Sequence, residues 1–247
     1  MEDPKPLISI VTVCYNVVNE LKKTIPSVLN QTYNNVEYIV IDGGSTDGTV
    51  EVIKKYANKL AYWVSEPDKG IYDAMNKGIR AARGEWINFM NAGDLFYSKN
   101  TLENIFSKSI NNEIKVIYGD VMLDRKGVLI QGKVYPISFM QIAMPFCHQS
   151  SFSRRSEYKK GFNLQFKIGG DFEFYYKIYH QYGNEVFLYI PANIAIYENA
   201  EGLSTIQIKK CRKEWLMIRS DHKNIRWYFD YLKYFIKYKV LNIKDSW

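Results

Sequence analysis

The chain has 247 residues, 47% of them hydrophobic, which is enough for one large α/β domain or for a domain with a tail. Its three cysteines, Cys14, Cys147 and Cys211, lie far apart and form no CxxC pair, which argues against a disulfide framework or a zinc site and fits a reducing compartment. The net charge of +7 lies entirely in residues 206–247, which hold eleven Lys/Arg and four Asp/Glu. The opening residues do not predict a signal peptide, and no stretch reaches the roughly 18 apolar residues of a membrane span.

The first hundred residues alternate β-branched apolar runs with amphipathic segments. The predicted strands are 7–15, 36–44, 60–66 and 85–90, and the predicted helices are 19–30, 45–57 and 71–82. We expect Asn19 to cap the first helix, and Pro26 to kink it or make its start irregular. Strands and helices that alternate at this spacing predict a parallel sheet with crossover helices.

The next hundred residues continue the mixed pattern. Here the predicted strands are 115–123, 127–134 and 185–198, and the predicted helices are 102–110, 137–144 and 169–183. The charge distribution adds a boundary near residue 205. We therefore expect one domain over 1–205 and a basic, aromatic-rich helical tail over 206–247.

Acidic residues follow three of the predicted strands. The glycine-rich stretch 43–48 is no dinucleotide loop, because Ser45 stands where GxGxxG needs its second glycine, and there is no GxxxxGK[ST] loop. Instead Asp42, Asp68 and Asp94 come at strand ends, which we expect to share one crevice. Several carboxylates would repel an anionic substrate unless a divalent cation lay between them, so Asp94 is the expected metal ligand. Any one of them alone would be interpreted as a solvated turn residue or a helix cap, and the prediction rests on their occurrence together.

Three stretches then carry a resemblance. The segments SIVTVCYN, LKKTIPSVLNQTYNNVEYIVIDGGSTDGT and SEPDKGIYDAMNKGIRAARGEWINFMNAGD resemble the nucleotide-sugar domain of the family 2 glycosyltransferases. The resemblance implies an α/β GT-A fold, a Rossmann-like and mostly parallel sheet flanked by helices. It places the nucleotide-sugar half in residues 1–100 and the acceptor half in 101–205. The block EPDKGIYDAMNKG, with FCHQSSFSRR and IGGDFEFYYKI, is similar to a subgroup that acts in bacterial O-antigen, capsule and exopolysaccharide assembly.

The resemblance also implies roles for individual residues. It places Asp171 as the general base of an inverting reaction and Asp94 as the ligand of Mn²⁺ or Mg²⁺, with His148 as a second ligand. The nucleotide-sugar site would be formed by Thr12, Tyr15, Asn16, Asp42, Asp68, Lys69, Asn76, Asn91 and Asp94.

The chain departs from the family pattern at two positions. Gly43 replaces the second Asp after the second strand, and Asn91 replaces the first Asp of the DxD motif, which leaves one certain carboxylate for the metal. Alternatives stay open for other residues. Asp171 could be a helix cap, with Glu173 as the base. His148 could be structural, and Arg154 and Arg155 could contact the acceptor or the diphosphate.

The tail interleaves aromatic and basic residues at roughly helical spacing, from Trp215 to Ile236. Such helices lie in membrane interfaces, with cations toward anionic lipid. The alternative is a helical pair packed on the body or on a second subunit, as in a homodimer. Nucleic acid is not an expected partner, because the body is neutral and carries no recognition motif.

The resulting expectation is an inverting hexosyltransferase. It would move a hexose from a nucleotide diphosphate sugar, expected to be a UDP-sugar, to a hydroxyl of a lipid-linked oligosaccharide. It would act in the cytoplasm, peripheral to the inner membrane. The alternatives are a sugar-1-phosphate nucleotidyltransferase, which would need a glycine- and arginine-rich loop where this chain has CYNVVNE, and a catalytically inactive sugar-nucleotide-binding or scaffold protein, which Asn91 would suit.

Overall fold

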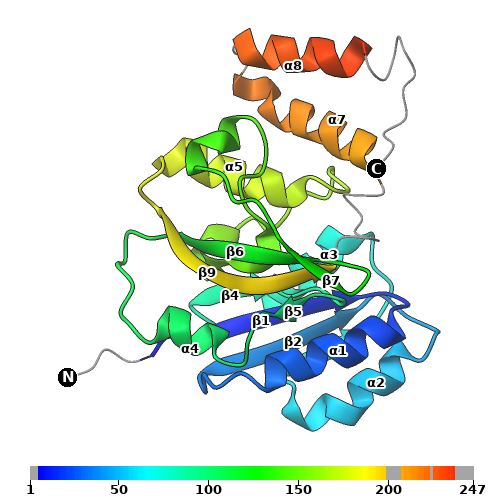
Figure 1. The fold of residues 1–247 in the computed structure, drawn as a ribbon. Helices are drawn as coiled ribbons and strands as arrows, with labels where there is room; N and C mark the ends of the chain where they lie inside the picture. The colour runs from blue at the N-terminus through cyan, green and yellow to red at the C-terminus, as the bar shows by residue number, and fades with distance from the viewer. Residues whose placement is uncertain (1–4, 199–206, 223–224, 237–247) are drawn as a thin grey trace.

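The computed structural model describes residues 5–198, 207–222 and 225–236 (Figure 1). The alternation expected for the first hundred residues is confirmed. The elements in order are β1 (Ile8–Cys14), α1 (Val18–Leu29), β2 (Val36–Asp42), α2 (Thr49–Tyr56), the 3-10 helix η1 (Ala57–Lys59), β3 (Tyr62–Ser65), α3 (Ile71–Ala81) and β4 (Trp86–Phe89).

These four strands are parallel neighbours, with β1 between β2 and β4. Cys14 pairs with Asp42, and Val11 pairs with Phe89. The carboxyl ends of the strands therefore share one edge of the sheet. In parallel α/β sheets this edge is where ligands bind.

The second half extends the same sheet with strands of both directions. Its elements are β5 (Leu95–Phe96), α4 (Thr101–Phe106), β6 (Val116–Arg125), β7 (Val128–Gln131), η2 (Ile137–Gln141), η3 (His148–Ser150), β8 (Ser151–Arg154), η4 (Arg155–Tyr158), α5 (Gly170–Tyr182) and β9 (Phe187–Glu198). In the part of the chain that the structure describes, nine strands form one sheet in the order β3-β2-β1-β4-β8-β6-β9-β5, with β7 paired to β6. The α/β GT-A-like fold is thus confirmed.

Two local predictions for this half were wrong. The helix predicted over 137–144 is only the short 3-10 helix η2, which begins directly after Pro136. Strand β8 was not predicted, yet it lies antiparallel between β4 and β6 and joins the two halves of the sheet. Its sequence, SFSR, alternates serines with larger side chains over only four residues, which is too short to give a clear period-2 signal.

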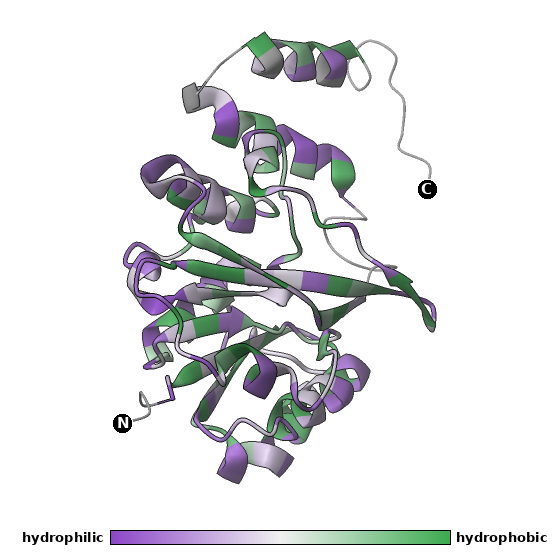
Figure 2. Cartoon of the chain, turned by 60° about the vertical axis from the view of Figure 1, so that its left-hand side comes forward, coloured by the Kyte–Doolittle hydropathy of each residue, from purple (hydrophilic) through white to green (hydrophobic). Residues whose placement is uncertain are grey.

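Helices cover both faces of the sheet. On one face Ile10 and Val40 lie in a core with Leu21 and Ile25 of α1 and Ile53 of α2. On the other face Val11 and Ile39 pack with residues of α3 and α5, among them Met75 and Phe172. Figure 2 shows hydrophobic residues along the central strands and hydrophilic residues on the outer sides of the helices.

Helix α1 begins one residue before the expected cap. Its N-cap is Val17, so the prediction for Asn19 was wrong. Pro26 lies inside the helix, which continues to Leu29, and the amide of Asn30 still donates to the Pro26 carbonyl at 3.0 Å. The start of α1 is held from outside, because the Val18 amide donates to Asp47 Oδ2.

The tail forms α7 (Ile208–Ile218), η5 (Arg219–His222) and α8 (Ile225–Phe235). Figure 1 shows α7 next to α5, and α8 beyond α7 as the outermost element. Cys211, Leu216 and Ile218 of α7 are buried, so this helix packs on the body, as the alternative reading of the tail expected. The part of the tail after residue 236 lies outside the described residues. Among the helices that the structure describes, none combines the length and the apolar character needed to cross a membrane.

Candidate active site

A pocket of about 550 Å³ opens beside the carboxyl edge of the parallel strands. Asn91 and Asp94 line it from the turn after β4, and His148 lines it from η3. Asp171 lines it from the first turn of α5, and Trp215 from α7. Segments far apart in the sequence therefore converge on one cavity that contains two of the predicted carboxylates.

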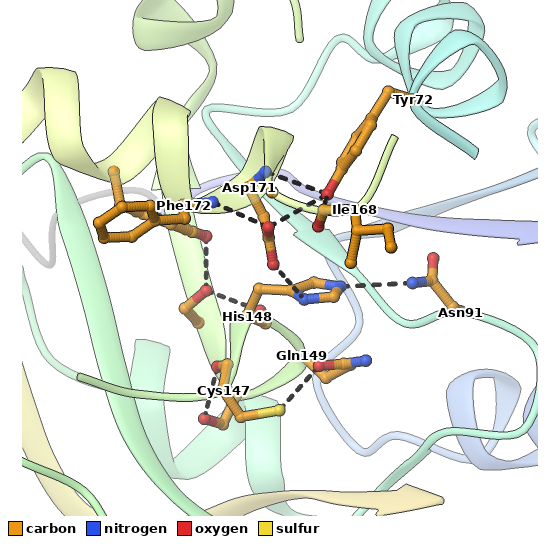
Figure 3. A network of polar contacts seen from close by, with 12 residues as sticks. Tyr72, Asn91, Cys147, His148, Gln149, Ile168, Asp171 and Phe172 are labelled. Carbon is orange, nitrogen blue, oxygen red and sulfur yellow. Dashed lines mark hydrogen bonds and ion pairs between the residues drawn. The ribbon is translucent and has the colours of Figure 1, made fainter. Parts of the chain in front are cut away.

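Asp171 is held on both of its carboxylate oxygens. Tyr72 Oη lies 3.1 Å from Oδ1, and the amide of Phe172 donates to the same oxygen at 2.8 Å. His148 Nδ1 lies 3.2 Å from Oδ2 (Figure 3). Asp171 keeps 22% of its side chain exposed. It is therefore fixed in orientation and still accessible from the pocket.

Tyr72 comes from the EPDKGIYDAMNKG block and is buried. Its hydroxyl also donates to the carbonyl of Ile168, three residues before Asp171. A Cβ atom on Gly170 would lie 2.9 Å from the Tyr72 ring, so only glycine allows the ring to reach this position. Burial, and then the charge of Asp171, raises the pKa of Tyr72 well above its usual range, so its hydroxyl stays protonated. No sequence motif indicated that Tyr72 contacts the candidate base.

The second carboxylate, Asp94, is buried with 4% exposure. Gln149 Nε2 donates to its Oδ2 at 2.9 Å. In the same turn, Asn91 Nδ2 lies 3.3 Å from His148 Nε2. Among the described residues, Asn91 Oδ1 is a buried oxygen without a hydrogen-bond partner. Both ring nitrogens of His148 thus contact protein groups: Nε2 contacts Asn91 in the turn after β4, and Nδ1 contacts Asp171 at the start of α5.

Asp42 and Asp68 do not line this pocket. The Asp42 side chain is fully buried and accepts hydrogen bonds from the amides of Gly44 and Ser45 and from the Ser65 hydroxyl. It therefore shapes the loop after β2. A Cβ on Gly43 would lie 2.5 Å from Asp68 Oδ2, so the Asp68 carboxylate lies directly beside this glycine.

Three other predicted residues lie near β1. Tyr15 is 61% exposed, and its ring lies next to Gly43. Asn16 lines the pocket, has a positive φ of 51° and accepts a hydrogen bond from the Thr46 amide. Thr12 is buried and bonds to Tyr38 Oη and to the Met90 carbonyl, so it supports the end of β4 from within the core.

The remaining predicted residues lie away from the pocket lining. Lys69 lines a neighbouring concavity. Asn76 holds the backbone of Phe162, because its Nδ2 donates to the Phe162 carbonyl and its Oδ1 accepts from the Phe162 amide.

The alternative catalytic and binding residues also lie elsewhere. Arg154 donates to the Ile114 carbonyl and Arg155 to the Gly84 carbonyl, near the start of β4 rather than its end. Glu173 is buried and forms an ion pair with Lys177.

The tail contributes to the site. Glu214 on α7 is buried and accepts hydrogen bonds from the amides of Lys167, Ile168 and Gly169, the segment that leads to Asp171. The Trp215 ring lies 5.2 Å from that of Phe172. The only signal for this role in the sequence is that a single acidic residue directly follows the basic stretch 209–213.

The thiols near the site are not activated. Burial, and then the charge of Asp94, raises the pKa of Cys147. Burial, and then the charges of Asp171 and Glu214, raises the pKa of Cys211 to about 12. Burial thus keeps both thiols in the neutral form, which disfavours either as a nucleophile. Within residues 5–198, 207–222 and 225–236, no group of three or more His, Cys, Asp or Glu residues could hold a metal by itself.

Solved structures share this fold. The chain matches S. aureus TarS residues 1–349, solved in complex with UDP-GlcNAc, with a TM-score of 0.70 and 16% identity, covering 96% of this chain and 74% of that one. It matches the mannosyltransferase PcManGT of Pyrobaculum calidifontis, solved with GDP-Man and Mn²⁺, with a TM-score of 0.69 and 16% identity, covering 95% and 71%. The chain spans 43% of a longer TarS chain. The chain therefore shares the fold of these structures.

Sequence comparison gives the family. The model of glycosyl transferase family 2 matches residues 9–185. A glycosyltransferase of PGL/p-HBAD biosynthesis from Mycobacterium bovis is 29% identical over 83% of this chain and 82% of its own length. An uncharacterized glycosyltransferase of Mycobacterium tuberculosis is 35% identical over 68% and 67%. The chain belongs to glycosyl transferase family 2 and is a glycosyltransferase. The resemblance to the family is thus confirmed, and the nucleotidyltransferase alternative is set aside.

Proposed function

We propose that this chain is an inverting hexosyltransferase that uses a nucleotide diphosphate sugar, Asp171 as its general base and a divalent cation at Asp94. The observation that carries the proposal is that Asp94 and Asp171 line the same pocket from different elements, the β4 turn and the start of α5. An inverting transfer needs one group at the leaving diphosphate and another at the attacking hydroxyl. The pocket offers a carboxylate for each.

On the donor side, the residues present fit a hard cation. Asp94 supplies a buried carboxylate, and Asn91 Oδ1 is a buried oxygen without a partner among the described residues. Oxygen ligands suit Mn²⁺ and Mg²⁺, and Mg²⁺ commonly uses one or two carboxylates together with substrate phosphates. When bound, the cation would stabilise the charge on the leaving diphosphate. His148 contacts protein groups with both ring nitrogens, so we assign it to the base side rather than to the metal.

The nucleoside would lie beside the loops after β1 and β2. Tyr15 offers an exposed ring there, and Asp68 lies next to Gly43. Because the Asp42 carboxylate accepts hydrogen bonds from its own loop and from Ser65 of β3, we propose that it positions this loop instead of contacting the base directly. A UDP-sugar remains our choice of donor. It is supported by the resemblance, and TarS of the same fold was solved with UDP-GlcNAc.

On the acceptor side, Asp171 takes the proton of the attacking hydroxyl as the new glycosidic bond forms. Tyr72 and His148 hold its two oxygens, so the carboxylate is oriented before the acceptor arrives. Such preorganised general-base catalysis contributes about 10²- to 10⁴-fold to the rate.

We further propose a lipid-linked oligosaccharide acceptor at the inner face of a bacterial membrane. The support is the exposed apolar face of α8, formed by Ile225, Phe229 and Leu232 at helical spacing and continued by the exposed Ile236 just after the helix. Trp227 points the other way, because its Nε1 donates to the Leu216 carbonyl of α7. We also propose a role in O-antigen or capsule assembly, on the basis of the sequence resemblance. The mycobacterial relative is named for a different process, PGL/p-HBAD biosynthesis.

The test combines binding and turnover. Calorimetry with UDP and Mn²⁺ should show equal binding to the wild type and to Asp171→Asn. Hydrolysis and transfer from a panel of nucleotide sugars should fall about 10²- to 10⁴-fold in Asp171→Asn. Glu173→Gln is the matched control and should keep its activity. Undiminished turnover in Asp171→Asn would reject the base, and binding without turnover in the wild type would favour the inactive scaffold.

A further inference from the structure

A second concavity, of about 360 Å³, adjoins the active-site pocket. The two have Ile71, Tyr72 and Ile168 in common in their linings, so these residues lie between them. Tyr72 therefore faces the catalytic carboxylate with its hydroxyl and contributes to the neighbouring concavity as well. A ligand in this second site would lie one side chain away from the site of transfer.

Three lysines from three separate segments line the second concavity. Lys69 precedes α3, Lys167 precedes α5, and Lys210 lies on α7. The single carboxylate in the lining, Asp73, accepts a hydrogen bond from the backbone amide of Lys69 at 3.0 Å. In the described part of the chain, no carboxylate forms an ion pair with any of the three ammonium groups. The lining thus carries an excess of positive charge.

A third concavity shows that a lining with several basic residues does not necessarily carry an excess of positive charge. It measures about 480 Å³ and is lined by Lys77, Arg80 and Arg83. There, however, Lys77 pairs with Glu66 at 2.9 Å, and Arg83 pairs with Glu37 at 3.0 Å. Most of its charge is compensated within the protein. The lysines beside Tyr72 lack such compensation, and like charges that converge without a counterion repel one another.

The backbone adds to the positive potential. Helix α3 begins at Ile71, and the residues at its start, Lys69 to Tyr72, line the concavity. The first amides of a helix have no partner within it, and the helix dipole places partial positive charge there. Gly70 has φ 115°, and a Cβ there would meet nothing within 4 Å, so no side chain packs over the backbone at this position. The amides of Lys69 and Gly70 already donate to Asp73 Oδ2 and Asp68 Oδ1, so the three lysines are the main feature that favours an anion, and the helix dipole adds to it.

We propose that this concavity binds a phosphate-class anion, and that the anion is the phosphate that joins the acceptor glycan to its lipid. The second half of the statement rests on the proposed function, because a lipid-linked acceptor carries such a phosphate and Asp171 lies just beyond Tyr72. Lysine binds phosphate as a mobile point charge, which suits a ligand that must enter and leave at each turnover. On this assignment Lys69 serves the acceptor rather than the nucleotide.

The binding test needs no turnover, so it is independent of the proposed function. The full chain, labelled with ¹³C-lysine and loaded with UDP and Mg²⁺ to fill the donor pocket, is titrated with inorganic phosphate at constant ionic strength. We expect the Lys69, Lys167 and Lys210 signals to shift and saturate together, while Lys22 and Lys23 on α1 stay unchanged. Uniform, unsaturated shifts of all lysines would overturn the site.

Variants sharpen the result. The double variant Lys167→Gln/Lys210→Gln should weaken phosphate binding about tenfold, because two charge-assisted contacts are lost at an exposed site. It should keep donor hydrolysis, which does not use the acceptor. Lys213→Gln, an exposed lysine of α7 outside the lining, is the matched control and should bind phosphate like the wild type. Equal affinity in the double variant would overturn the site.

A second arm distinguishes two sources of the phosphate. Glucose 1-phosphate, inorganic phosphate and methyl glucoside are compared on the same lysine signals, followed by vesicles that contain phosphatidylglycerol. Binding of glucose 1-phosphate at least as tight as that of phosphate, without binding of methyl glucoside, supports the acceptor. A response to the vesicles alone would overturn the acceptor assignment in favour of a lipid headgroup.

Discussion

Glu214 Oε2 lies 2.8 Å from the amide nitrogen of Gly169, two residues before Asp171. The same carboxylate accepts hydrogen bonds from the amides of Ile168 and Lys167. A residue of the basic tail therefore fixes the backbone that presents the candidate base. The tail is part of the active-site scaffold, whatever else α8 does.

We expect Glu214→Ala to destabilise the chain by about 1–3 kcal/mol, because three backbone donors lose a buried acceptor. Turnover should fall further than the loss of folded protein explains, since the segment before Asp171 is no longer held. Urea unfolding and donor hydrolysis measure the two effects, with Lys213→Ala as the control on the exposed face of the same helix. Full activity in a folded Glu214→Ala protein would contradict this role.

Tyr72→Phe should lower kcat about 10- to 100-fold, because it removes the hydroxyl that contacts Asp171 and the Ile168 carbonyl. The affinity for UDP should stay unchanged, since Tyr72 acts through the base. Steady-state kinetics and calorimetry separate the two quantities. Tyr179→Phe, a change at a half-buried residue of α5 whose hydroxyl accepts a hydrogen bond from Gln141, is the matched control. A change in UDP affinity with unaltered kcat would disprove a positioning role.

Metal binding should depend on the nucleotide. The described residues offer one buried carboxylate and one amide oxygen, so we expect Mn²⁺ alone to bind weakly and UDP to strengthen its binding by supplying phosphate oxygens. Asp94→Asn should abolish this mutual effect, which calorimetry in both orders of addition detects. Asn91→Asp should strengthen Mn²⁺ binding in the absence of UDP. Equal Mn²⁺ affinity with and without UDP would count against a shared site.

A pH effect on stability is expected from Glu37, which is buried beneath the 83–84 turn. Burial alone would raise its pKa, but hydrogen bonds from Ser9, Arg83 and Gly84 outweigh burial and lower it. A carboxyl group whose folded pKa is depressed stabilises the fold above its unfolded pKa of about 4.3, and this contribution is lost as the pH falls through the folded value.

Glu37→Gln should therefore cost about 1–3 kcal/mol at pH 7, and the difference from the wild type should shrink below about pH 4. Urea unfolding at pH 7, 5 and 3.5 measures it. Glu51→Gln, an exposed change on α2, should have little effect at any of these pH values. A difference that grows on acidification would have the wrong sign for this mechanism.

The exposed face of α8 should mediate membrane binding. Replacing Phe229 and Leu232 by serine removes two side chains that are 58% and 52% exposed, so the fold should persist. Co-sedimentation with vesicles that contain anionic lipid should then drop several-fold. Val128→Ser/Ile130→Ser on β7 removes similarly exposed apolar side chains elsewhere and is the control. Dimer dissociation without any change in vesicle binding would assign α8 to a second subunit instead.

Local sequence patterns predicted the parallel half of the fold well. Strands β1, β2 and β4 are almost entirely buried and mostly apolar, and the helices between them have clear 3.6-residue periodicity. Strand β8 was missed because its serines pack between two other strands, a tertiary relationship that four residues do not reveal. The helix predicted over 137–144 was too long for a related reason. Its apolar residues pack against the core although most of the segment is not helical, so their spacing resembled that of a helix.

The candidate site shows the same division. Asp94 and Asp171 could be named from motifs, and the structure brings them to one pocket. Their supports could not be named, because Tyr72, His148 and Glu214 each lie more than twenty residues along the chain from the carboxyl group or backbone they hold. Asp42, conversely, looked like a ligand contact by position, yet its hydrogen bonds are satisfied within its own loop.

The close fit between the Tyr72 ring and Gly170 has a consequence for engineering donor and acceptor specificity. Exchanging the two halves between relatives is an obvious route to new enzymes. Any parent with a side chain at the position of Gly170 would collide with the ring brought in by the other half. Productive chimeras of this chain should therefore inherit the tyrosine and the glycine together, as one unit of recombination.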